Sequence, residues 1–324
     1  MKKITGLVLA AAMLGSIANA RAQDAGDYPN KPLHIIVPYV AGGGGDIFAR
    51  RLAGPLAKEL GTEIIVENRG GAGGNIGMQA AAAAPPDGYN IVFALSVQLA
   101  LNATMYPNKG WDAIEDFEPI TYIAWAPYVL VMHPSIPVKN IPELIAYEKE
   151  HPGSLSFASP GIGSPPHLAG AQINKLAGIN MQHIPYQGGG AVYPDLLAGR
   201  VSMYFATLSS SAGHIKDGKL NLIATGAAKR PSVLPDLPTV AETLPGIDVN
   251  VWYGVLAPKG TPRPIIDKLN AAFIEAMKDP ELSQVLAADA VEFVGSTPEE
   301  LTGHIRTEIE KWAPIIKESG ATLN

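Results

Sequence analysis

Four consecutive glycines, Gly42 to Gly45, form the stretch of this sequence best suited to bind a ligand through its main chain. Glycine has no Cβ, so the backbone there can adopt φ > 0 and approach a ligand closely. The glycines lie between a short apolar run, Ile35 to Val37, and a segment from Asp46 onward whose apolar residues recur every four positions. A buried strand, a glycine turn and a helix in this order predict an anion site, because unpaired amides and the positive helix end converge there.

A small anion fits this turn better than a nucleotide does. The spacing does not match the G-x-G-x-x-G pattern of dinucleotide-binding turns, although Glu67 ends the next predicted strand, about where a ribose-binding acid would stand. No G-K-[S/T] follows the glycines, which excludes a P-loop. Asp46 is a good N-cap residue, so we expect it to cap the helix, with direct ligand contact as the alternative. A tight turn that binds nothing is the remaining interpretation.

A second junction of the same kind follows the strand predicted at 155–158. Ser159 to Gly163 form its glycine-rich turn, Ser164 is an expected N-cap, and Pro165 suits the first helical position. Ser164 and His167 could also act as nucleophile and base, but neither a G-x-S-x-G elbow nor a third group accompanies them. A capping serine and a histidine that lines a cleft are therefore favoured over a hydrolase.

The elements around the first junction alternate between strand and helix. Further strands are predicted at 63–66 and 89–95, the second ending at Ser96. This β-α-β-α-β order implies a parallel sheet with right-handed crossovers, and ligands bind at the carboxyl ends of such strands. Tyr39, Gly43 to Asp46 and Ser96 all follow predicted strands at those ends.

The mature chain is long enough for two such units. Apolar runs at 122–130 and 249–257 are predicted to cross between them, which would permit hinge closure of the kind seen in periplasmic binding proteins. We expect one domain from 23–125 together with 249–324, and a second domain from 126–248. Helices are predicted over 262–278, 280–288 and 298–319, each with a proline near its start.

The first 22 residues have the pattern of a cleavable signal peptide. Lys2 and Lys3 precede a short apolar stretch, Leu7 to Ala18, and small-x-small sites follow it. The stretch is too short to span a membrane, so we expect an exported, soluble protein. There is no Cys among the 324 residues, which excludes disulfides and a lipoprotein anchor.

Charge and histidine spacing exclude several function classes. Without the three basic residues of the signal peptide, 21 basic and 30 acidic residues remain, a net charge of −9. That charge argues against binding nucleic acid or an anionic membrane surface. The seven His residues show no H-E-x-x-H pattern or clustering, so we expect neither a metal site nor a cofactor.

Several motifs, taken in order, resemble one protein family. The chain is similar to the Bug receptors, the periplasmic solute-binding subunits of tripartite tricarboxylate transporters, over essentially all of its mature length. The motifs are Pro-Tyr-Val-Ala-Gly-Gly-Gly-Gly-Asp at 38–46, Val-Glu-Asn-Arg-Gly-Gly-Ala-Gly-Gly-Asn-Ile-Gly at 66–77, Pro-Pro-Asp-Gly-Tyr at 85–89, Ser-Pro-Gly-Ile-Gly-Ser-Pro-Pro-His-Leu-Ala-Gly at 159–170, His-Ile-Pro-Tyr-Gln-Gly-Gly-Gly at 183–190, Asp-Leu-Leu-Ala-Gly-Arg-Val at 195–201 and Lys-Arg-Pro-Ser-Val-Leu-Pro-Asp-Leu-Pro-Thr-Val-Ala-Glu at 229–242.

The resemblance implies an α/β fold of the periplasmic binding protein (Venus flytrap) type. Each domain is then a mainly parallel sheet flanked by helices, and two strands cross between the domains. It also implies a monomeric periplasmic receptor that holds a carboxylate between the loops at 39–46 and 159–167 and passes it to transporter subunits in the membrane. The ligand-binding residues expected on this basis are Tyr39, Gly43, Gly44, Gly45, Asp46, Ser96, Ser159, Gly161, Gly163, Ser164, His167 and Thr207.

Two departures from the family pattern bear on the ligand. Gly45 stands where the family often has Thr, and Ala206-Thr207 stands where Asp-Asn or Asp-Ser is usual. We expect the first change to leave room for a wider ligand and the second to remove a carboxylate near the pocket. Both favour a carboxylate with a flat or bulky apolar body, such as an aromatic mono- or dicarboxylate, over citrate or an amino acid. The alternatives are a receptor that signals to a sensor kinase and a secreted hydrolase that uses Ser164 and His167.

Overall fold

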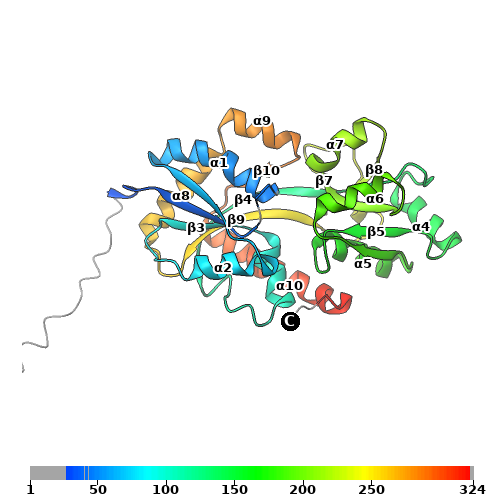
Figure 1. Cartoon of the computed structure of the whole chain (residues 1–324), viewed down its shortest axis with the longest axis horizontal. Coiled ribbons are helices and arrows are strands. Elements are labelled where there is room, and N and C mark those ends of the chain that lie inside the picture. Colours follow the sequence, from blue (N-terminus) through cyan, green and yellow to red (C-terminus); the bar gives the residue numbers. More distant parts are fainter. Residues whose placement is uncertain (1–26, 40, 43, 322–324) are drawn as a thin grey trace, which may run out of the picture.

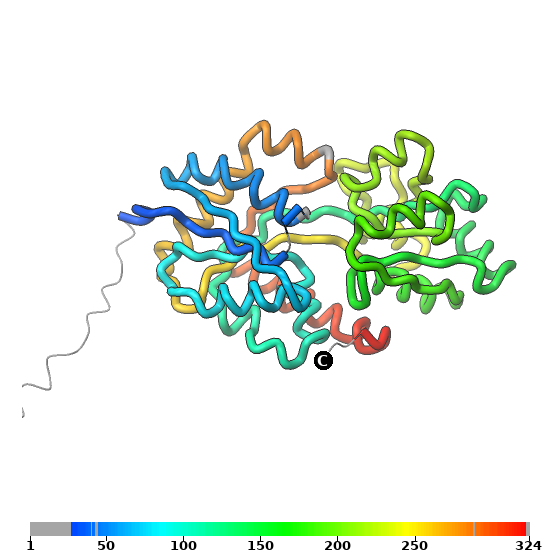
Figure 2. Tube along the Cα trace, viewed as in Figure 1, coloured from blue at the N-terminus to red at the C-terminus, as the bar shows by residue number. Residues whose placement is uncertain are grey.

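The computed structural model describes residues 27–321 except residues 40 and 43. The predicted signal peptide and Gly43 therefore lie outside the described residues. Two α/β units lie end to end along the long axis of the molecule, and two long strands run between them (Figure 1). The trace in Figure 2 enters the second unit in green and returns to the first in yellow. The predicted two-unit fold with two crossing strands is confirmed.

Unit 1 is built on a sheet with the strand order β2-β1-β3-β9-β4, and β10 pairs with β4. Pairs β1–β2 and β1–β3 are parallel, and the other pairs are antiparallel. Buried Ile35 and Ile36 confirm the buried strand predicted before the glycines. The strands are β1 (Leu33–Val37), β2 (Ile64–Asn68), β3 (Asn90–Leu95), β4 (Phe117–Met132), β9 (Asn250–Pro258) and β10 (Glu292–Phe293).

Unit 2 is built on the parallel strands β6-β5-β7. Strand β4 continues into this unit and pairs antiparallel with β7 and β8. The sheets are therefore mixed, whereas the sequence predicted mainly parallel ones. Strands local to a unit pair in parallel, and the crossing strands add the antiparallel pairs because each runs back against its neighbours. The strands are β5 (Ser156–Ser159), β6 (Gln182–Pro185), β7 (Met203–Thr207) and β8 (Asn221–Thr225).

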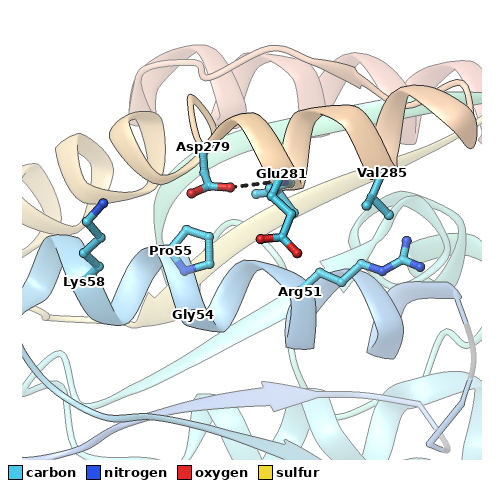
Figure 3. A pocket seen from close by; sticks show the side chains of 8 residues that line it. Arg51, Gly54, Pro55, Lys58, Asp279, Glu281 and Val285 are labelled. Atoms are coloured by element: carbon cyan, nitrogen blue, oxygen red, sulfur yellow. Dashed lines mark hydrogen bonds between the residues drawn. The ribbon is translucent and has the colours of Figure 1, made fainter.

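Helices flank both sheets, and Figure 3 shows α9 lying along α1. Helices α9 and α10 begin and end where the sequence predicted. Unit 1 contains α1 (Gly44–Leu60), α2 (Asn75–Ala82), α3 (Asn102–Met105), α8 (Arg263–Ala276), α9 (Pro280–Ala288), α10 (Pro298–Ser319), the 3-10 turn η2 (Ala72–Gly74) and the π-helix η3 (Val97–Leu101). Unit 2 contains α4 (Ile141–Glu150), α5 (Pro165–Ala177), α6 (Tyr193–Leu197), α7 (Leu208–Lys216) and the 3-10 turns η4 (Gly189–Val192) and η5 (Val240–Glu242).

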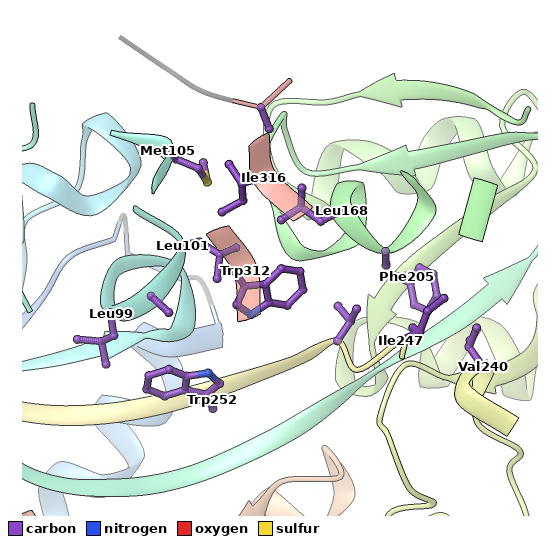
Figure 4. Packing of buried hydrophobic residues seen from close by; sticks show 14 of the residues in the cluster. Leu99, Leu101, Met105, Leu168, Phe205, Val240, Ile247, Trp252, Trp312 and Ile316 are labelled. Carbon is purple, nitrogen blue, oxygen red and sulfur yellow. The ribbon is translucent and has the colours of Figure 1, made fainter. Parts of the chain in front are cut away.

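One apolar cluster continues from unit 1 into unit 2. Trp312 of α10 lies between Leu101 on one side and Leu168 and Phe205 on the other, and Trp252 of β9 belongs to the same cluster (Figure 4). A separate cluster in unit 1 packs α1, α8 and α9 against the opposite face of the sheet, and Phe48 and Tyr253 belong to it. The shared cluster means that the two units are joined by packing as well as by the chain.

Two backbone hydrogen bonds through Gly226 join the two crossing segments, and we call this connection the clasp. The amide of Gly226 donates to the carbonyl of Tyr128 at 2.8 Å, and the amide of Val249 donates to the carbonyl of Gly226 at 2.8 Å. A Cβ at Gly226 would lie 2.8 Å from the Val249 carbonyl oxygen, so this close approach requires glycine. The position at which the chain divides into domains, 125/126 and 248/249, stays a prediction.

Helix α10 holds the crossing region from one side. The buried carboxylate of Glu308 accepts hydrogen bonds from the indole nitrogens of Trp252 at 3.1 Å and Trp312 at 3.0 Å. Further along the helix, Lys175 of α5 pairs with Glu318 at 2.5 Å. Helix α10 therefore contacts the crossing strands and unit 2 as well as its own unit.

Candidate ligand-binding site

The first glycine junction confirms the predicted strand, turn and helix, but Asp46 has a different role from the one expected. Helix α1 begins at Gly44, so Asp46 lies inside its first turn and is not the N-cap residue. Its buried carboxylate accepts hydrogen bonds from the Gly42 amide at 2.7 Å, Arg50 Nε at 2.9 Å and Asn68 Nδ2 at 2.9 Å. Asp46 thus ties the glycine turn to the helix and to β2.

The charge of Asp46 is stabilised at this place. Burial by itself would raise the pKa of the carboxyl, but hydrogen bonds from Gly42, Asn68 and Arg50 outweigh that effect. Together they hold the pKa of Asp46 below its ordinary value. The carboxylate is therefore ionised and occupied at neutral pH, which leaves it little capacity to bind a ligand.

Tyr39 packs against the start of α1. Its hydroxyl accepts a hydrogen bond from the Leu95 amide at 2.6 Å and donates to the Gln98 side chain. A Cβ at Gly45 would lie 2.9 Å from Leu95 Cδ1 and 3.2 Å from Tyr39 Cε2. The expectation that Gly45 leaves room for a wider ligand is therefore wrong, because Leu95 and Tyr39 fill that space.

Ser96 stands at the carboxyl end of β3, where the π-helix η3 starts. The residue is 1% exposed, and its hydroxyl has no hydrogen-bond partner among the described residues. Buried hydroxyls normally have a partner, so this one is a candidate contact for a bound molecule.

The second junction is also confirmed as strand, turn and helix, but Ser164 does not cap α5 with its side chain. It occupies the N-cap position in an extended conformation, yet its hydroxyl donates to the Gly161 carbonyl at 2.6 Å. His167 instead accepts a hydrogen bond at Nδ1 from the Gly163 amide at 3.1 Å. The side chains at this junction therefore shape the turn. Pro165 and Pro166 have no N–H, so the first amide of α5 is that of His167.

His183 of β6 completes this junction and was not predicted as a site residue. Its ring stacks on that of His167 with centroids 4.0 Å apart, and its Nε2 lies 2.7 Å from the Ser159 hydroxyl. Ser159 in turn accepts from the Gly161 amide at 3.2 Å. The register of β6 against β5, which sets His183 beside Phe157, places the ring here.

Both imidazoles are neutral at physiological pH. Burial lowers the pKa of His183 to about 4, and the neighbouring His167 adds to the shift. Burial also lowers the pKa of His167. The second junction is therefore built from neutral rings and hydroxyls, and it carries no ionised side chain among these residues.

The residues predicted to bind the ligand form two groups in the structure. Gly45 and Tyr39 lie together in unit 1 against Leu95, the residue before Ser96. The residues from Ser159 to His167 are linked by hydrogen bonds in unit 2. Figure 1 shows the start of α1 on the side of unit 1 that faces unit 2. The two units touch at Gly163, where a Cβ would lie 2.4 Å from Met105 Cε of α3.

Thr207 belongs to neither turn but lines a cavity with Ile47 and Phe48 of α1. Its hydroxyl is 2.8 Å from the Ser210 hydroxyl, and it lines a cavity of about 360 Å³ that also touches α1 and α9. Ala206 points the other way, into the core of unit 2, and is fully buried. The residue at position 206 therefore does not face this cavity. Having Ala206 in place of the Asp common in the family does not remove a carboxylate from the cavity wall.

A larger pocket, of about 470 Å³, lies between α1 and α9 (Figure 3). All of its lining residues belong to these two helices and the turn before α9, with Arg51 and Lys58 on one side and Asp279 and Glu281 on the other. None comes from a glycine junction or from unit 2, so size alone does not make it the ligand site.

Within residues 27–321 other than 40 and 43, no group of His, Asp and Glu side chains is arranged to hold a metal ion. Over the same residues, none of the helices is both long and apolar enough to span a bilayer.

Comparisons with known proteins agree with this architecture. BugT of Bordetella pertussis is 35% identical over 298 residues, covering 91% of each chain. The solved periplasmic binding protein BugD is 34% identical with a TM-score of 0.78, covering 91% of this chain and 99% of that one. Rpa4515 of R. palustris, solved with adipate, is 31% identical with a TM-score of 0.81, covering 91% of this chain and 99% of that one.

The fold and these similarities define a two-domain solute-binding protein of the periplasmic type. The sequence model for the tripartite tricarboxylate transporter family receptor, TctC, matches residues 48–321. The chain belongs to that family, and the resemblance to Bug receptors seen in the sequence is confirmed.

Proposed function

We propose that this protein is a periplasmic receptor that binds a small carboxylate between its two units and delivers it to a tripartite tricarboxylate-type transporter. The observation that carries the proposal is the duplicated junction: a strand, a glycine turn and a helix start occur in each unit. Helix starts bind anions through unpaired amides. The unpartnered hydroxyl of Ser96 adds a donor beside the first of them.

Backbone donors are sufficient for useful affinity. A hydrogen bond to a charged group contributes roughly 1.5–3 kcal/mol, so four or five could exceed the roughly 8 kcal/mol of micromolar binding before ordering costs are subtracted. A buried Arg at the glycine turns is not required. Such a site also suits a receptor that must release its ligand.

A carboxylate with an apolar body remains the proposed ligand class, now for a different reason. The arguments from Gly45 and Ala206 do not hold, but the cavity beside Thr207 has an apolar part that includes Phe48, Val251 and Leu286. The adipate bound to the R. palustris relative has the same character, with carboxylates on a methylene chain. Aromatic mono- and dicarboxylates are included in the proposal, and citrate and aspartate should bind less well.

Receptor function is favoured over catalysis by the bonding of Ser164 and His167. The Ser164 hydroxyl donates to the Gly161 carbonyl, and His167 Nδ1 accepts from the Gly163 amide. A serine nucleophile requires a base within hydrogen-bond reach of its hydroxyl, and both groups are engaged elsewhere. The proposal is therefore a receptor without enzymatic activity.

Isothermal titration calorimetry with terephthalate, benzoate, adipate, citrate and aspartate tests the proposal. We expect one site per chain for at least one carboxylate, tightest for an apolar-bodied one, and recovery of the ligand unchanged. Absence of binding across the panel, or consumption of the compound, would contradict it. Thermal unfolding gives an independent check, because a ligand at about 100 times its Kd adds roughly 2.7 kcal/mol to stability.

We further propose that ligand closes the two units about the clasp at Tyr128, Gly226 and Val249, with the domains divided as the sequence predicts. The support is that the two chain crossings and α10 provide the main connections between the units, with smaller contacts between Met105 and Gly163 and between Ser232 and Glu292. Small-angle scattering should show a smaller radius of gyration when ligand is added. An unchanged profile at saturating ligand would remove the support for closure.

A further inference from the structure

A cavity of about 360 Å³ lies between the two units, beside the first turns of α1. Its volume is within the range of pockets that hold small molecules. Unit 1 supplies α1, the crossing strands and the end of α9, and unit 2 supplies the end of β7 and the first turn of α7. The lining residues are Ile47, Phe48, Arg51, Ala126, Thr207, Ser209, Val251, Tyr253, Leu286, Asp289 and Val291.

The cavity wall has both apolar and polar parts, and its apolar part is built around two aromatic rings. The rings of Phe48 and Tyr253 meet edge to face with centroids 4.9 Å apart, and Val251 and Leu286 are buried beside them. Such a wall favours a hydrocarbon chain or a flat ring over a hydrated polar body.

Arg51 is the one cation among the residues that line this cavity. Its side chain is 41% exposed, and its ion pair with Asp289 is long, with Nη1 to Oδ2 at 3.4 Å. The neighbouring Arg50 is held more closely, by Asp46 at 2.9 Å and Asn68 at 2.6 Å. Burial raises the pKa of Asp289, so its carboxylate is the less favourably solvated partner. A ligand carboxylate can therefore compete with Asp289 for the guanidinium, which binds carboxylates in a two-pronged geometry.

Helix geometry places Arg51 at a suitable distance from the first glycine turn. Arg51 follows Gly45 by six residues, or about 9 Å along the helix axis. Helical side chains lean toward the N-terminus, which brings the guanidinium back toward the turn. The hydroxyls of Thr207 and Ser209 line the same cavity from unit 2. A benzene ring or a short methylene chain can bridge this span.

We propose that this cavity is the subsite for the far end of the ligand, that Arg51 takes a second ligand carboxylate in exchange for Asp289, and that the protein therefore selects dicarboxylates with an apolar spacer. This inference rests on the proposed function, because it assumes that the first carboxylate is held at the glycine turns.

Two pairs of ligands that differ by one carboxylate test the inference: adipate against hexanoate, and terephthalate against benzoate. Calorimetry is done on the full mature chain and on three variants. Arg51→Gln removes the proposed contact, and Asp289→Asn removes its competitor. Lys58→Gln removes an exposed cation on the same helix that lines the neighbouring pocket and not this cavity, and serves as the matched control. Thermal unfolding without ligand checks that each variant is folded.

Wild type should bind at least one dicarboxylate more tightly than its monocarboxylate partner. Arg51→Gln should weaken that dicarboxylate by about 10- to 100-fold and change the monocarboxylate by less than about twofold. Asp289→Asn should tighten the dicarboxylate by about two- to fivefold, and Lys58→Gln should leave both ligands unchanged. If Arg51→Gln does not fold, the effect of Asp289→Asn on dicarboxylate affinity decides whether the inference holds.

Equal effects of Arg51→Gln on both members of a pair, or no effect on either, would overturn the inference and leave the proposed function intact. The same holds if wild type prefers the monocarboxylates. If wild type binds no carboxylate at all, the proposed function fails first and the inference fails with it, so the two failures are distinguishable in the wild-type titration.

Discussion

The two glycine junctions share one order of elements, but they are held in place by different chemistry. At the first, the buried carboxylate of Asp46 joins the Gly42 amide to Arg50 and Asn68. At the second, the turn is fixed by uncharged groups, namely the rings of His167 and His183 and the hydroxyl of Ser159. The first turn is anchored by ionic hydrogen bonds and the second by stacking and neutral hydrogen bonds.

In both cases one member of the anchor lies on the neighbouring parallel strand. Asn68 ends β2 and is paired in register with Val37, the last residue of β1. His183 lies on β6 beside Phe157 of β5. A glycine turn after a strand is thus fixed by a polar side chain on the next strand of the sheet. The difference in charge between the two anchors leads to different responses to pH and to mutation.

The largest effect is expected at the charged anchor. Asp46→Asn should lower the free energy of unfolding by about 3 kcal/mol, because a buried carboxylate with three hydrogen bonds loses its charge and part of its bonding. Urea unfolding at neutral pH measures the loss. Asp217→Asn, which changes an exposed carboxylate, should cost less than about 0.5 kcal/mol. Equal costs for the two variants would show that the first turn does not depend on this network.

A smaller effect is expected where Tyr39 and Leu95 pack on the start of α1. Gly45→Ala should destabilise the protein by about 1–2 kcal/mol, because its Cβ meets Leu95 at 2.9 Å and Tyr39 at 3.2 Å. Gly54→Ala in the same helix has open space around the new Cβ and should stabilise by about 0.5–1 kcal/mol. A loss of thermal stability in Gly45→Ala together with a gain in Gly54→Ala would support the packing argument. A gain of stability in both variants would mean that the space at Gly45 is open.

Acid should affect the second junction before the first. The pKa of His183 in the folded protein, about 4, lies below its ordinary value of 6.5, so the unfolded chain binds more protons between pH 4 and 6.5. The contribution of His183 to the free energy of unfolding is fully present above about pH 6.5 and declines as the pH falls toward 4. Asp46 has a lowered pKa, so its contribution persists until the pH falls below the ordinary carboxyl range.

Hydrogen exchange followed by mass spectrometry can separate these two responses. Between pH 7 and pH 5, with intrinsic exchange rates corrected, peptides covering 159–167 should lose protection while those covering 44–50 keep theirs. His183→Phe retains the stacked ring but removes the titrating nitrogen, and should flatten the pH dependence of stability in this window. A wild-type slope in the variant would assign the acid response to other groups.

The sequence was sufficient to predict the strand, turn and helix of each junction, the crossing strands and the C-terminal helices, because periodicity and glycine placement report local structure. The bounds of α9 and α10 were predicted correctly, and the strand of each junction was found. The hydrogen-bonding and packing partners of individual side chains were predicted wrongly. The predicted caps at Asp46 and Ser164 and the open space at Gly45 depended on where Gly42, Gly161 and Leu95 lie in three dimensions, which sequence spacing does not specify.

His183 and Arg51 were missed for the same reason. His183 was inside a predicted strand, and only the pairing of β6 with β5 brings it to Ser159. Arg51 lies in a predicted helix and not in a glycine turn, and the second turn of α1 places it at the cavity shared with unit 2. Polar residues on the strand or helix that adjoins a glycine turn are the signal that could have identified both.

The smallest effect is expected at Ser164. Its hydroxyl donates to the Gly161 carbonyl at 2.6 Å and accepts from no amide of α5, so Ser164→Ala should cost only about 0.5 kcal/mol. Thr297→Ala provides the matched control, since Thr297 caps α10 in a capping box with Glu300 and should cost about 1–2 kcal/mol. Ligand affinity, measured separately by calorimetry, should weaken, because this hydroxyl shapes the turn whose amides, with that of His167, are proposed to bind the carboxylate. A loss of stability as large as that of Thr297→Ala would restore Ser164 as a cap. Unchanged affinity in the folded variant would place the ligand away from the second turn.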